Sequence, residues 1–259
     1  MTYLGVDGNP TACDDGYAIV IRINGAGGHV LRESYLDAQG ESVMTSMGYA
    51  QLRTQYDEDG NPVYMLYLDQ AGNPTPGAQG FCAVSYAYDD NERPIETAYD
   101  DGYGNPVEGP EGYARVAMAY DEDDRLTQQS FYGADGGLIV AAAGYAQVAY
   151  SYDEDDNCTQ ERYFGADGAP RLMMGGYAGV SRTFDGDGNC TQVWYYDEAD
   201  QPCVTPEGYA SAAYTYDDRD RLITERYYDA SGNLTISAMG VAGANMAYDQ
   251  RGNLLGRTY

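Results

Sequence analysis

The sequence predicts an all-β fold made of eight tandem 32-residue β-hairpin repeats that form an open solenoid or superhelical ribbon. A Gly-Tyr-Ala triplet, or a near relative, begins at Gly16 and returns at Gly48, an interval of 32 residues that continues without an insertion. Within each interval, bulky and small residues alternate with period two, which is typical of strands. Tight-turn dipeptides follow the alternating segments.

The repeat defines the domain organisation. A fixed period in this range indicates one supersecondary unit stacked on copies of itself, because so small a unit cannot bury its apolar face alone. We therefore interpret residues 1–259 as a single repeat array. Its triplets start at Gly16, Gly48, Gly80, Gly112, Gly144, Gly176, Gly208 and Gly240.

The first strand of a repeat is expected from Tyr145 to Tyr152 and its equivalents. Val148, Tyr150 and Tyr152 point one way, and smaller residues such as Ala149 point the other way. We expect the bulky face to form the core.

A turn and a second strand follow. The stretch from Asp153 to Asn157 reads Asp-Gly-Asp-Gly-Asn in another repeat, and such dipeptides supply the positive φ angles of a hairpin turn. The second strand is expected from Cys158 to Phe164. A second turn, Gly165 to Gly168, then begins an irregular return loop, so each unit has two strands and no helix.

The amino-acid composition excludes some classes of binding partner. The chain has 14 basic and 41 acidic residues, with a formal net charge of −27, so it repels phosphate backbones and anionic lipids. We expect no nucleic-acid binding and no membrane insertion, because no apolar run reaches the length of a span. The start lacks a signal peptide and falls inside a repeat, which suggests a segment of a longer protein. Cys158 and Cys190 share a repeat position and are interpreted as small buried hydrophobes rather than a disulfide.

The recurring Tyr-Asp-x-x-Gly-Asn motif carries a resemblance. It occurs as Tyr248 to Asn253, begins also at Tyr56-Asp57 and Phe184-Asp185, and precedes polar strands such as Leu222 to Tyr227. The chain thereby resembles the tyrosine-aspartate (YD, or Rhs-type) repeats of bacterial surface and secreted proteins. The resemblance implies curled β-sheet, sometimes a shell around a toxin, and an extracellular or cell-surface location. There is a looser likeness to the hairpin repeats of choline-binding and clostridial toxin modules, which hold ligands between hairpins.

The acidic turns are candidate calcium sites. They offer carboxylate and amide oxygens at alternate positions, as calcium loops do, but lack the Gly and bidentate Glu of a helix-flanked calcium loop in register. Calcium coordination and plain turn formation are both interpretations of these side chains. The candidate ligands are Asp57, Asp59, Asn61, Asp185, Asp187 and Asn189.

Two tyrosine columns are candidates for ligand binding or for core. A tyrosine ring has an apolar body that suits a sugar face and a hydroxyl that suits sugar oxygens. We assign the strand-end column to the core: Tyr56, Tyr88, Tyr120, Tyr152 and Tyr216. The Gly-Tyr-Ala column could serve either role, since its Gly lets a ligand or a backbone approach closely. This column contains Tyr17, Tyr49, Tyr113, Tyr145, Tyr177 and Tyr209.

The sequence favours a non-catalytic role. His29, the single histidine, has no counterpart in other repeats, and no nucleophile-elbow, phosphate-loop or zinc-helix motif is present. We expect no enzyme activity and no cofactor other than calcium. The predicted function is an extended binding module for carbohydrate, with a glycan or another surface protein as partner. The alternative is a structural stalk, fibre subunit or shell segment, which could self-associate through the array ends.

Overall fold

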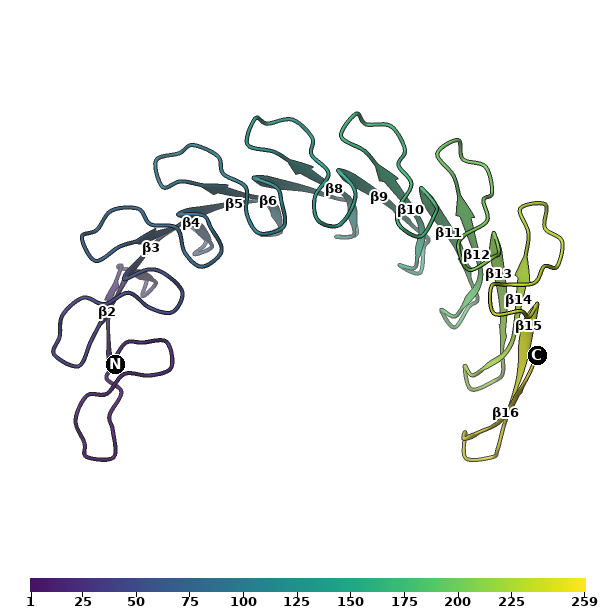
Figure 1. Ribbon diagram of the computed structural model, residues 1–259, viewed down its shortest axis with the longest axis horizontal. Coiled ribbons are helices and arrows are strands. Elements are labelled where there is room, and N and C mark those ends of the chain that lie inside the picture. The colour runs from purple at the N-terminus through teal and green to yellow at the C-terminus, as the bar shows by residue number, and fades with distance from the viewer. The chain divides into compact units, whose positions relative to one another are not determined.

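The strands follow one another in the sheet in the same order as in the sequence. The computed structural model describes all residues 1–259 and contains one 16-stranded sheet ordered β1 to β16 (Figure 1). The pairing is antiparallel, and β1 and β16 are the edge strands, so the predicted all-β class and open sheet of hairpins are confirmed. The structure has no helix, and therefore none long and apolar enough to cross a membrane.

The strands alternate between six and seven residues, apart from the shorter β16. Their bounds are β1 Ile19–Asn24, β2 Val30–Leu36, β3 Gln51–Tyr56, β4 Pro62–Leu68, β5 Ala83–Tyr88, β6 Pro94–Asp100, β7 Arg115–Tyr120, β8 Leu126–Tyr132, β9 Gln147–Tyr152, β10 Cys158–Phe164, β11 Gly179–Phe184, β12 Cys190–Tyr196, β13 Ser211–Tyr216, β14 Leu222–Tyr228, β15 Gly243–Tyr248 and β16 Leu254–Thr258.

The hairpin β9–β10 shows how one repeat is built. Val148 lies opposite Tyr163, and Tyr150 lies opposite Glu161, so the bulky residues share one face as the alternation predicts. The register shifts between Cys158 and Gln160, where one extra residue forms a β-bulge beside the turn. The second strand has the predicted bounds.

The first strand begins two residues later than predicted, at Gln147 rather than Tyr145. The equivalent Tyr177 gives the reason. Its carbonyl accepts a hydrogen bond from the Met173 N–H at 2.8 Å, so this residue closes a turn before the strand begins. Alternation alone could not locate this boundary, because a turn-closing residue can continue the same pattern.

The return loop contains two ordered turns of the hairpin type, the predicted turn that begins at Gly165 and a further turn in the part expected to be irregular. In each, the first N–H donates to the fifth carbonyl and the fourth N–H donates to the first carbonyl, as in the turn from Asp153 to Asn157. The two loop turns run from Gly165 to Ala169 and from Met173 to Tyr177. Their fourth residues are Gly168 and Gly176, with φ of 75° and 74°. The triplet glycine is therefore a turn residue.

The chain folds into two units. Unit 1 comprises Met1–Met118 and Ser130–Ala142, and unit 2 comprises Ala119–Gln129 and Ala143–Tyr259. In unit 2, the turn between β15 and β16 and the return loop between β14 and β15 lie at opposite ends of the strands (Figure 1). We call the row of short turns the turn edge and the row of return loops the return-loop edge.

The core of each unit is thin and contains small residues. In unit 2, Val180, Val193, Ala212 and Tyr227 form a buried cluster. The alanine of the triplet is fully buried as well: Ala178 donates its N–H to the Tyr196 carbonyl and accepts from the Tyr163 N–H, at 2.7 and 2.9 Å. Unit 1 repeats this arrangement with Ala18 and Ala50, both 0% exposed. A larger side chain there would separate neighbouring strands.

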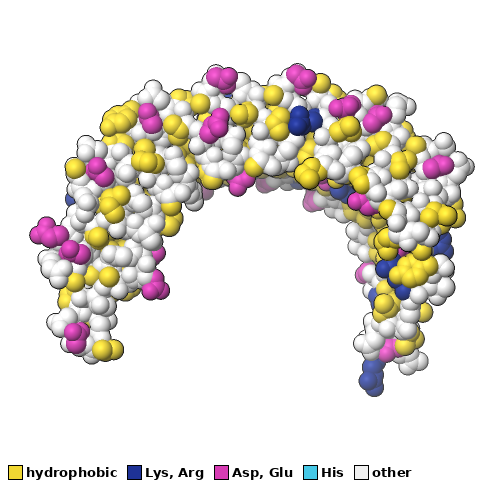
Figure 2. All heavy atoms as spheres, in the orientation of Figure 1, with side chains coloured by type: hydrophobic (Ala, Val, Ile, Leu, Met, Phe, Trp, Pro, Cys, Tyr) yellow, Lys and Arg dark blue, Asp and Glu magenta, His cyan; other side chains and the backbone are white.

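The surface carries the charge that the composition predicts. On the face drawn in Figure 2, acidic side chains are spread over the surface and basic side chains are few. The five cysteines are free thiols, and Cys158 and Cys190 are half-buried rather than fully buried as predicted. They lie beside the turn edge, where the thin sheet covers side chains incompletely.

Candidate functional site

The Gly-Tyr-Ala tyrosines belong to a ladder of aromatic rings near the return-loop edge. Each alternates with an aromatic residue from a second strand, with ring centroids 4.4 to 6.3 Å apart. Unit 1 contains the rings of Tyr3, Tyr17, Tyr35, Tyr49, Tyr67, Phe81, Tyr99, Tyr113 and Phe131. Unit 2 contains the rings of Tyr145, Tyr163, Tyr177, Tyr195, Tyr209 and Tyr227.

The local sequence positions these rings. The turn glycine brings Tyr177 back over the sheet, and the next residue, Ala178, pairs with strands on both sides. Tyr177 then lies between Tyr163 and Tyr195, with centroid distances of 6.3 and 5.0 Å. Tilted and offset ring pairs of this kind stabilise beyond their buried area. The rings are thus contacts between consecutive strands as well as candidate ligand contacts.

Burial changes the acidity of the ladder. It raises the pKa of Tyr195 to about 12, and burial together with the Glu225 carboxylate raises the pKa of Tyr227 to about 12. A buried phenol resists ionisation because the phenolate would lose its hydration. The neutral hydroxyls therefore persist well above neutral pH. Glycan binding by Tyr17, Tyr49, Tyr113, Tyr145, Tyr177 and Tyr209 stays a prediction.

The strand-end tyrosines are half-buried and tie each hairpin to the preceding one. Tyr152 donates its hydroxyl to the Leu126 carbonyl at 2.8 Å, and Tyr216 donates to the Cys190 carbonyl at 2.9 Å. In both cases the acceptor begins the second strand of the previous repeat. The column therefore supplies an interface contact, in keeping with the structural role that the sequence suggests.

The sequence reasoning missed a column of carboxylates, of which Glu225 is buried and Glu33 and Glu161 are half-buried. Glu225 is 8% exposed and accepts a hydrogen bond from the Tyr227 hydroxyl at 2.9 Å. Glu33 accepts from Tyr35 in the same way, and Glu161 accepts from Tyr163 and pairs with Arg182. The signal was a Glu two residues before the second-strand tyrosine. It was hard to recognise because the column holds Met65 and Val193 in other repeats.

The candidate calcium ligands lie in the turns of the turn edge. The Asp185 carboxylate accepts hydrogen bonds from the N–H groups of Asp187 and Asn189, at 3.1 and 2.9 Å, and its pKa is lowered chiefly by the bond from Asn189. Asp57 accepts from Asp59 and Asn61 in the same manner. The first Asp of each turn thus organises its backbone.

No group of three or more His, Cys, Asp or Glu side chains is placed to hold a metal ion. Asp59 and Asp187 are exposed, whereas Asn61 and Asn189 donate side-chain N–H groups to the first Asp of their turns. Calcium binding stays a prediction, which a calcium titration against an equal ionic strength of sodium chloride would test.

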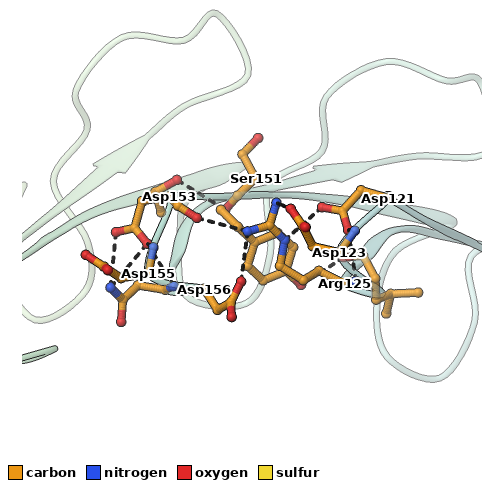
Figure 3. Close-up of polar contacts among 11 residues, drawn as sticks. Asp121, Asp123, Arg125, Ser151, Asp153, Asp155 and Asp156 are labelled. Carbon is orange, nitrogen blue, oxygen red and sulfur yellow. Dashed lines mark hydrogen bonds and ion pairs between the residues drawn. The ribbon is translucent and has the colours of Figure 1, made fainter.

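Arginine replaces the terminal Asn in some turns and bridges two of them (Figure 3). Arg125 contacts Asp121 at 2.8 Å and Asp123 at 3.0 Å in its own turn. It also contacts the Asp156 carboxylate and the Asp153 carbonyl in the next turn, both at 2.9 Å. Asp123, Arg125, Asp153 and Asp156 line an open cleft of about 630 Å³. The cleft is polar and anionic at its rim, since Asp123 and Asp156 are 69% and 73% exposed.

The comparisons with known proteins identify a shared fold. No protein-family model and no curated protein sequence matches the chain. Among solved structures, it is similar to TcdB2-TccC3-TEV, with a TM-score of 0.50 and 17% identity over 93% of this chain and 10% of that one. TcdB2-TccC3 gives a TM-score of 0.37 and 13% identity, over 95% and 13% of the two chains. The Tc holotoxin pore of Photorhabdus luminescens gives 0.18 and 14%, over 91% and 14%.

The first of these similarities shows the fold alone, because the identity is low. The chain spans about a tenth of the length of that structure.

Proposed function

We propose that the chain is a structural segment of a larger repeat protein of the YD or Rhs type, forming wall or stalk rather than a ligand-binding module. The observation that carries this proposal is the similarity in fold to TcdB2-TccC3-TEV, which extends over 93% of the chain.

The contacts between repeats support the same role. In unit 2, Tyr177 packs against rings on both sides, and the Tyr152 and Tyr216 hydroxyls bond to the preceding hairpin. The aromatic surface that could bind a sugar is therefore partly used for packing. Stability in such an array is approximately the sum of repeat terms and nearest-neighbour terms, so these contacts between repeats contribute to the stability of the whole array.

Location and partners are proposed from the resemblance to YD or Rhs-type repeats, which implies an extracellular or cell-surface location. We propose that this chain belongs to a secreted or extracellular protein, and that its partners are other protein components. Carbohydrate recognition is the outcome that would replace this proposal.

The test asks whether the rings stabilise the fold or bind a ligand. Tyr177→Ala should lower the free energy of unfolding by roughly 1–3 kcal/mol, since it removes a half-buried ring with two ring neighbours. Tyr177→Phe keeps the ring and should leave the stability within about 1 kcal/mol of the parent. Urea denaturation measures both.

A glycan array with the parent protein tests the alternative, carbohydrate binding. We expect no binding. The proposal is wrong if the parent binds a glycan and the triple variant Tyr113→Ala, Tyr145→Ala and Tyr177→Ala abolishes binding while the free energy of unfolding stays unchanged.

A further inference from the structure

Neighbouring turns of the turn edge enclose clefts, and the last residue of the first turn decides what lies in each cleft. We call this repeat position the bridge column. It is occupied by arginine, asparagine or, in one repeat, histidine. The column contains His29, Asn61, Arg93, Arg125, Asn157, Asn189, Arg221 and Asn253.

Arg125 shows how a guanidinium group fits such a cleft (Figure 3). It contacts the Asp123 carboxylate of its own turn at 3.0 Å. In the next turn it contacts the Asp156 carboxylate and the Asp153 carbonyl, both at 2.9 Å. Its Cζ atom also lies over the Tyr152 ring, 5.2 Å from the ring centroid. Carboxylates, a carbonyl and the face of an aromatic ring are groups that a guanidinium group binds well.

Other residues of the bridge column lie over the equivalent ring. Arg221 places its Cζ atom 4.7 Å from the centroid of the Tyr248 ring. In unit 1, the His29 ring lies 4.8 Å from the Tyr56 ring, centroid to centroid. The strand-end tyrosine is therefore a floor on which a flat side chain of the bridge column packs, in both units.

One cleft of unit 1 has the same acceptors, but its first turn ends in Asn61 instead of arginine. The cleft is open and has a volume of about 550 Å³. Glu92 has a φ of 61° and its equivalent Asp156 a φ of 65°, so the second turn has the same backbone conformation in the two clefts. The lining includes Asp59, Tyr88, Asp89 and Glu92, which occupy the repeat positions of Asp123, Tyr152, Asp153 and Asp156.

The acceptors beside Asn61 have no cation of their own. The Asn61 side-chain N–H donates to the Asp57 carboxylate of its own turn at 3.3 Å and does not cross to the next turn. The carboxylates of Asp59 and Glu92 are exposed and form no ion pair. The cleft thus has the acceptors that hold Arg125 in unit 2 and lacks the arginine.

The asparagines of two other clefts do not leave this arrangement. Asn189 donates its side-chain N–H to Asp220 of the next turn at 2.9 Å, so the chain itself supplies a donor to that carboxylate. Asn157 precedes a turn with Gly188 at the position of Glu92, and this turn therefore has no carboxylate there. The cleft beside Asn61 differs from both in having a full set of acceptors and no donor that crosses to them.

We propose that the cleft formed by Asp59, Tyr88, Asp89 and Glu92 binds a guanidinium group from outside the chain, either an arginine side chain of another polypeptide or a small free guanidinium compound. The ligand donates to the carboxylates of Asp59 and Glu92 and to the Asp89 carbonyl, and it lies over the Tyr88 ring. A lysine ammonium group fits less well, because it is not planar and cannot donate as a fork. The site is independent of the structural role proposed above.

The affinity should be low and dependent on salt. The carboxylates of Asp59 and Glu92 are exposed, and exposed ion pairs are weak and screened by salt. We therefore expect a dissociation constant in the millimolar range at low salt, which nuclear magnetic resonance can measure.

The test is a titration of the full-length, nitrogen-15-labelled chain with a blocked Gly-Arg-Gly tripeptide at low salt. The backbone N–H signals of Asn61 and Glu92 should shift and saturate. A citrulline tripeptide, which has nearly the same shape and no charge, should cause no shift, and a lysine tripeptide should bind more weakly. Agmatine distinguishes the two sources of the group: equal binding of agmatine and the tripeptide indicates a small ligand, and tighter binding of the tripeptide indicates a polypeptide.

Three variants test the cleft itself. Asn61→Arg supplies the chain with its own guanidinium group at the position of Arg125 and should abolish binding. Glu92→Gln removes one acceptor and should weaken binding about twofold to fivefold. Glu58→Gln is its matched control, because it removes the same charge from an exposed side chain that does not line the cleft, and it should leave binding unchanged. Urea midpoints establish that the variants are folded.

Three results would overturn the proposal. The citrulline tripeptide could shift the same signals as strongly as the arginine tripeptide, or a folded Asn61→Arg variant could bind as tightly as the parent. Equal weakening by Glu58→Gln and Glu92→Gln would show only a general attraction to an acidic surface. This last comparison decides the matter if Asn61→Arg does not fold.

Discussion

Two regions of unit 2 use the same five-residue backbone turn and surround it differently. The turn from Asp153 to Asn157, on the turn edge, is held by the Asp153 carboxylate, which accepts from the N–H groups of Asp155 and Asn157 at 3.1 and 2.9 Å. The turn from Met173 to Tyr177, on the return-loop edge, ends in a ring that packs between two others.

The difference shows that closing a turn and coupling neighbouring repeats depend on different residues. Asp, Asn and Gly suffice to close a turn locally at either edge. At the turn edge, neighbouring repeats are coupled by partly exposed ion pairs, as at Arg125, and by tyrosine hydroxyl bonds such as that of Tyr152 to Leu126. At the return-loop edge they are coupled by buried alanines and stacked rings. Burial is worth more than exposed ion pairs, so the return-loop edge should dominate stability.

The largest expected effect comes from a deletion that joins a strand to the wrong edge of the sheet. Deleting Gly48–Gln79 removes one repeat in register and should leave a folded protein, because each repeat contacts its neighbours in the same way. Deleting Gly48–Val63 instead removes β3, its turn and the first two residues of β4, so that the rest of β4 follows a return loop directly and its faces are misplaced. We expect this variant to unfold or aggregate. Equal stability of the two deletions in urea would show that 32 residues is not the structural unit.

Alkaline pH should weaken the return-loop edge. The pKa of Tyr195 is raised to about 12 by burial, whereas an unfolded tyrosine ionises near pH 10. The folded state therefore holds its protons longer, and the resulting stability is complete below about pH 10 and is lost as pH rises toward 12. Urea midpoints from pH 8 upward should fall steeply above pH 10. Tyr195→Phe should make that fall shallower, and an unchanged slope would contradict the burial argument.

The turn edge should lose stability at acidic pH. The Arg221 guanidinium lowers the pKa of Asp217 to about 2, so the contribution of this carboxylate is complete above about pH 4 and is lost as pH falls through 2.

A glycine pair distinguishes backbone strain from packing. Gly188 on the turn edge and Gly208 on the return-loop edge have φ of 84° and 88°, so alanine is strained at both positions. A Cβ at Gly208 would also lie 2.8 Å from the Ala238 backbone nitrogen, whereas one at Gly188 has no neighbour closer than 3.8 Å. Gly188→Ala should cost about 1–2 kcal/mol and Gly208→Ala about 3 kcal/mol or more. Similar unfolding free energies for the two would refute the difference between the edges.

The smallest expected effect is the loss of an arginine bridge. Arg125→Asn restores the residue found at positions 157 and 189 and retains a side chain able to close its own turn. It removes a part-buried hydrogen bond to the Asp153 carbonyl and an ion pair with the exposed Asp156 carboxylate, and salt screens the ion pair. The melting temperature should fall slightly at low salt and match the parent in about 1 M sodium chloride. A large loss that persists in high salt would place the coupling at the turn edge.

Particular residues show how far the sequence predicts the site. Asp57 and Asp185 are recognisable as turn residues because their hydrogen bonds reach two to four positions along the chain. The ladder is not recognisable, because Tyr177 meets Tyr163 and Tyr195 through pairing across three strands. Glu225 gave no clear signal for the same reason: its burial depends on Tyr227 and on Arg257, one repeat away.

By itself the sequence determined the repeat, the hairpin plan, the second-strand bounds and the turn residues, since period, alternation and turn chemistry all act within a few residues. Only the tertiary structure shows that the triplet tyrosines pack as a ladder, that a further ordered turn from Met173 to Tyr177 closes the return loop, and that Arg125 bridges neighbouring turns. These features need strands from consecutive repeats to lie side by side. Stacking, burial and ion pairing depend on distances in space, which the spacing of residues along one repeat does not contain.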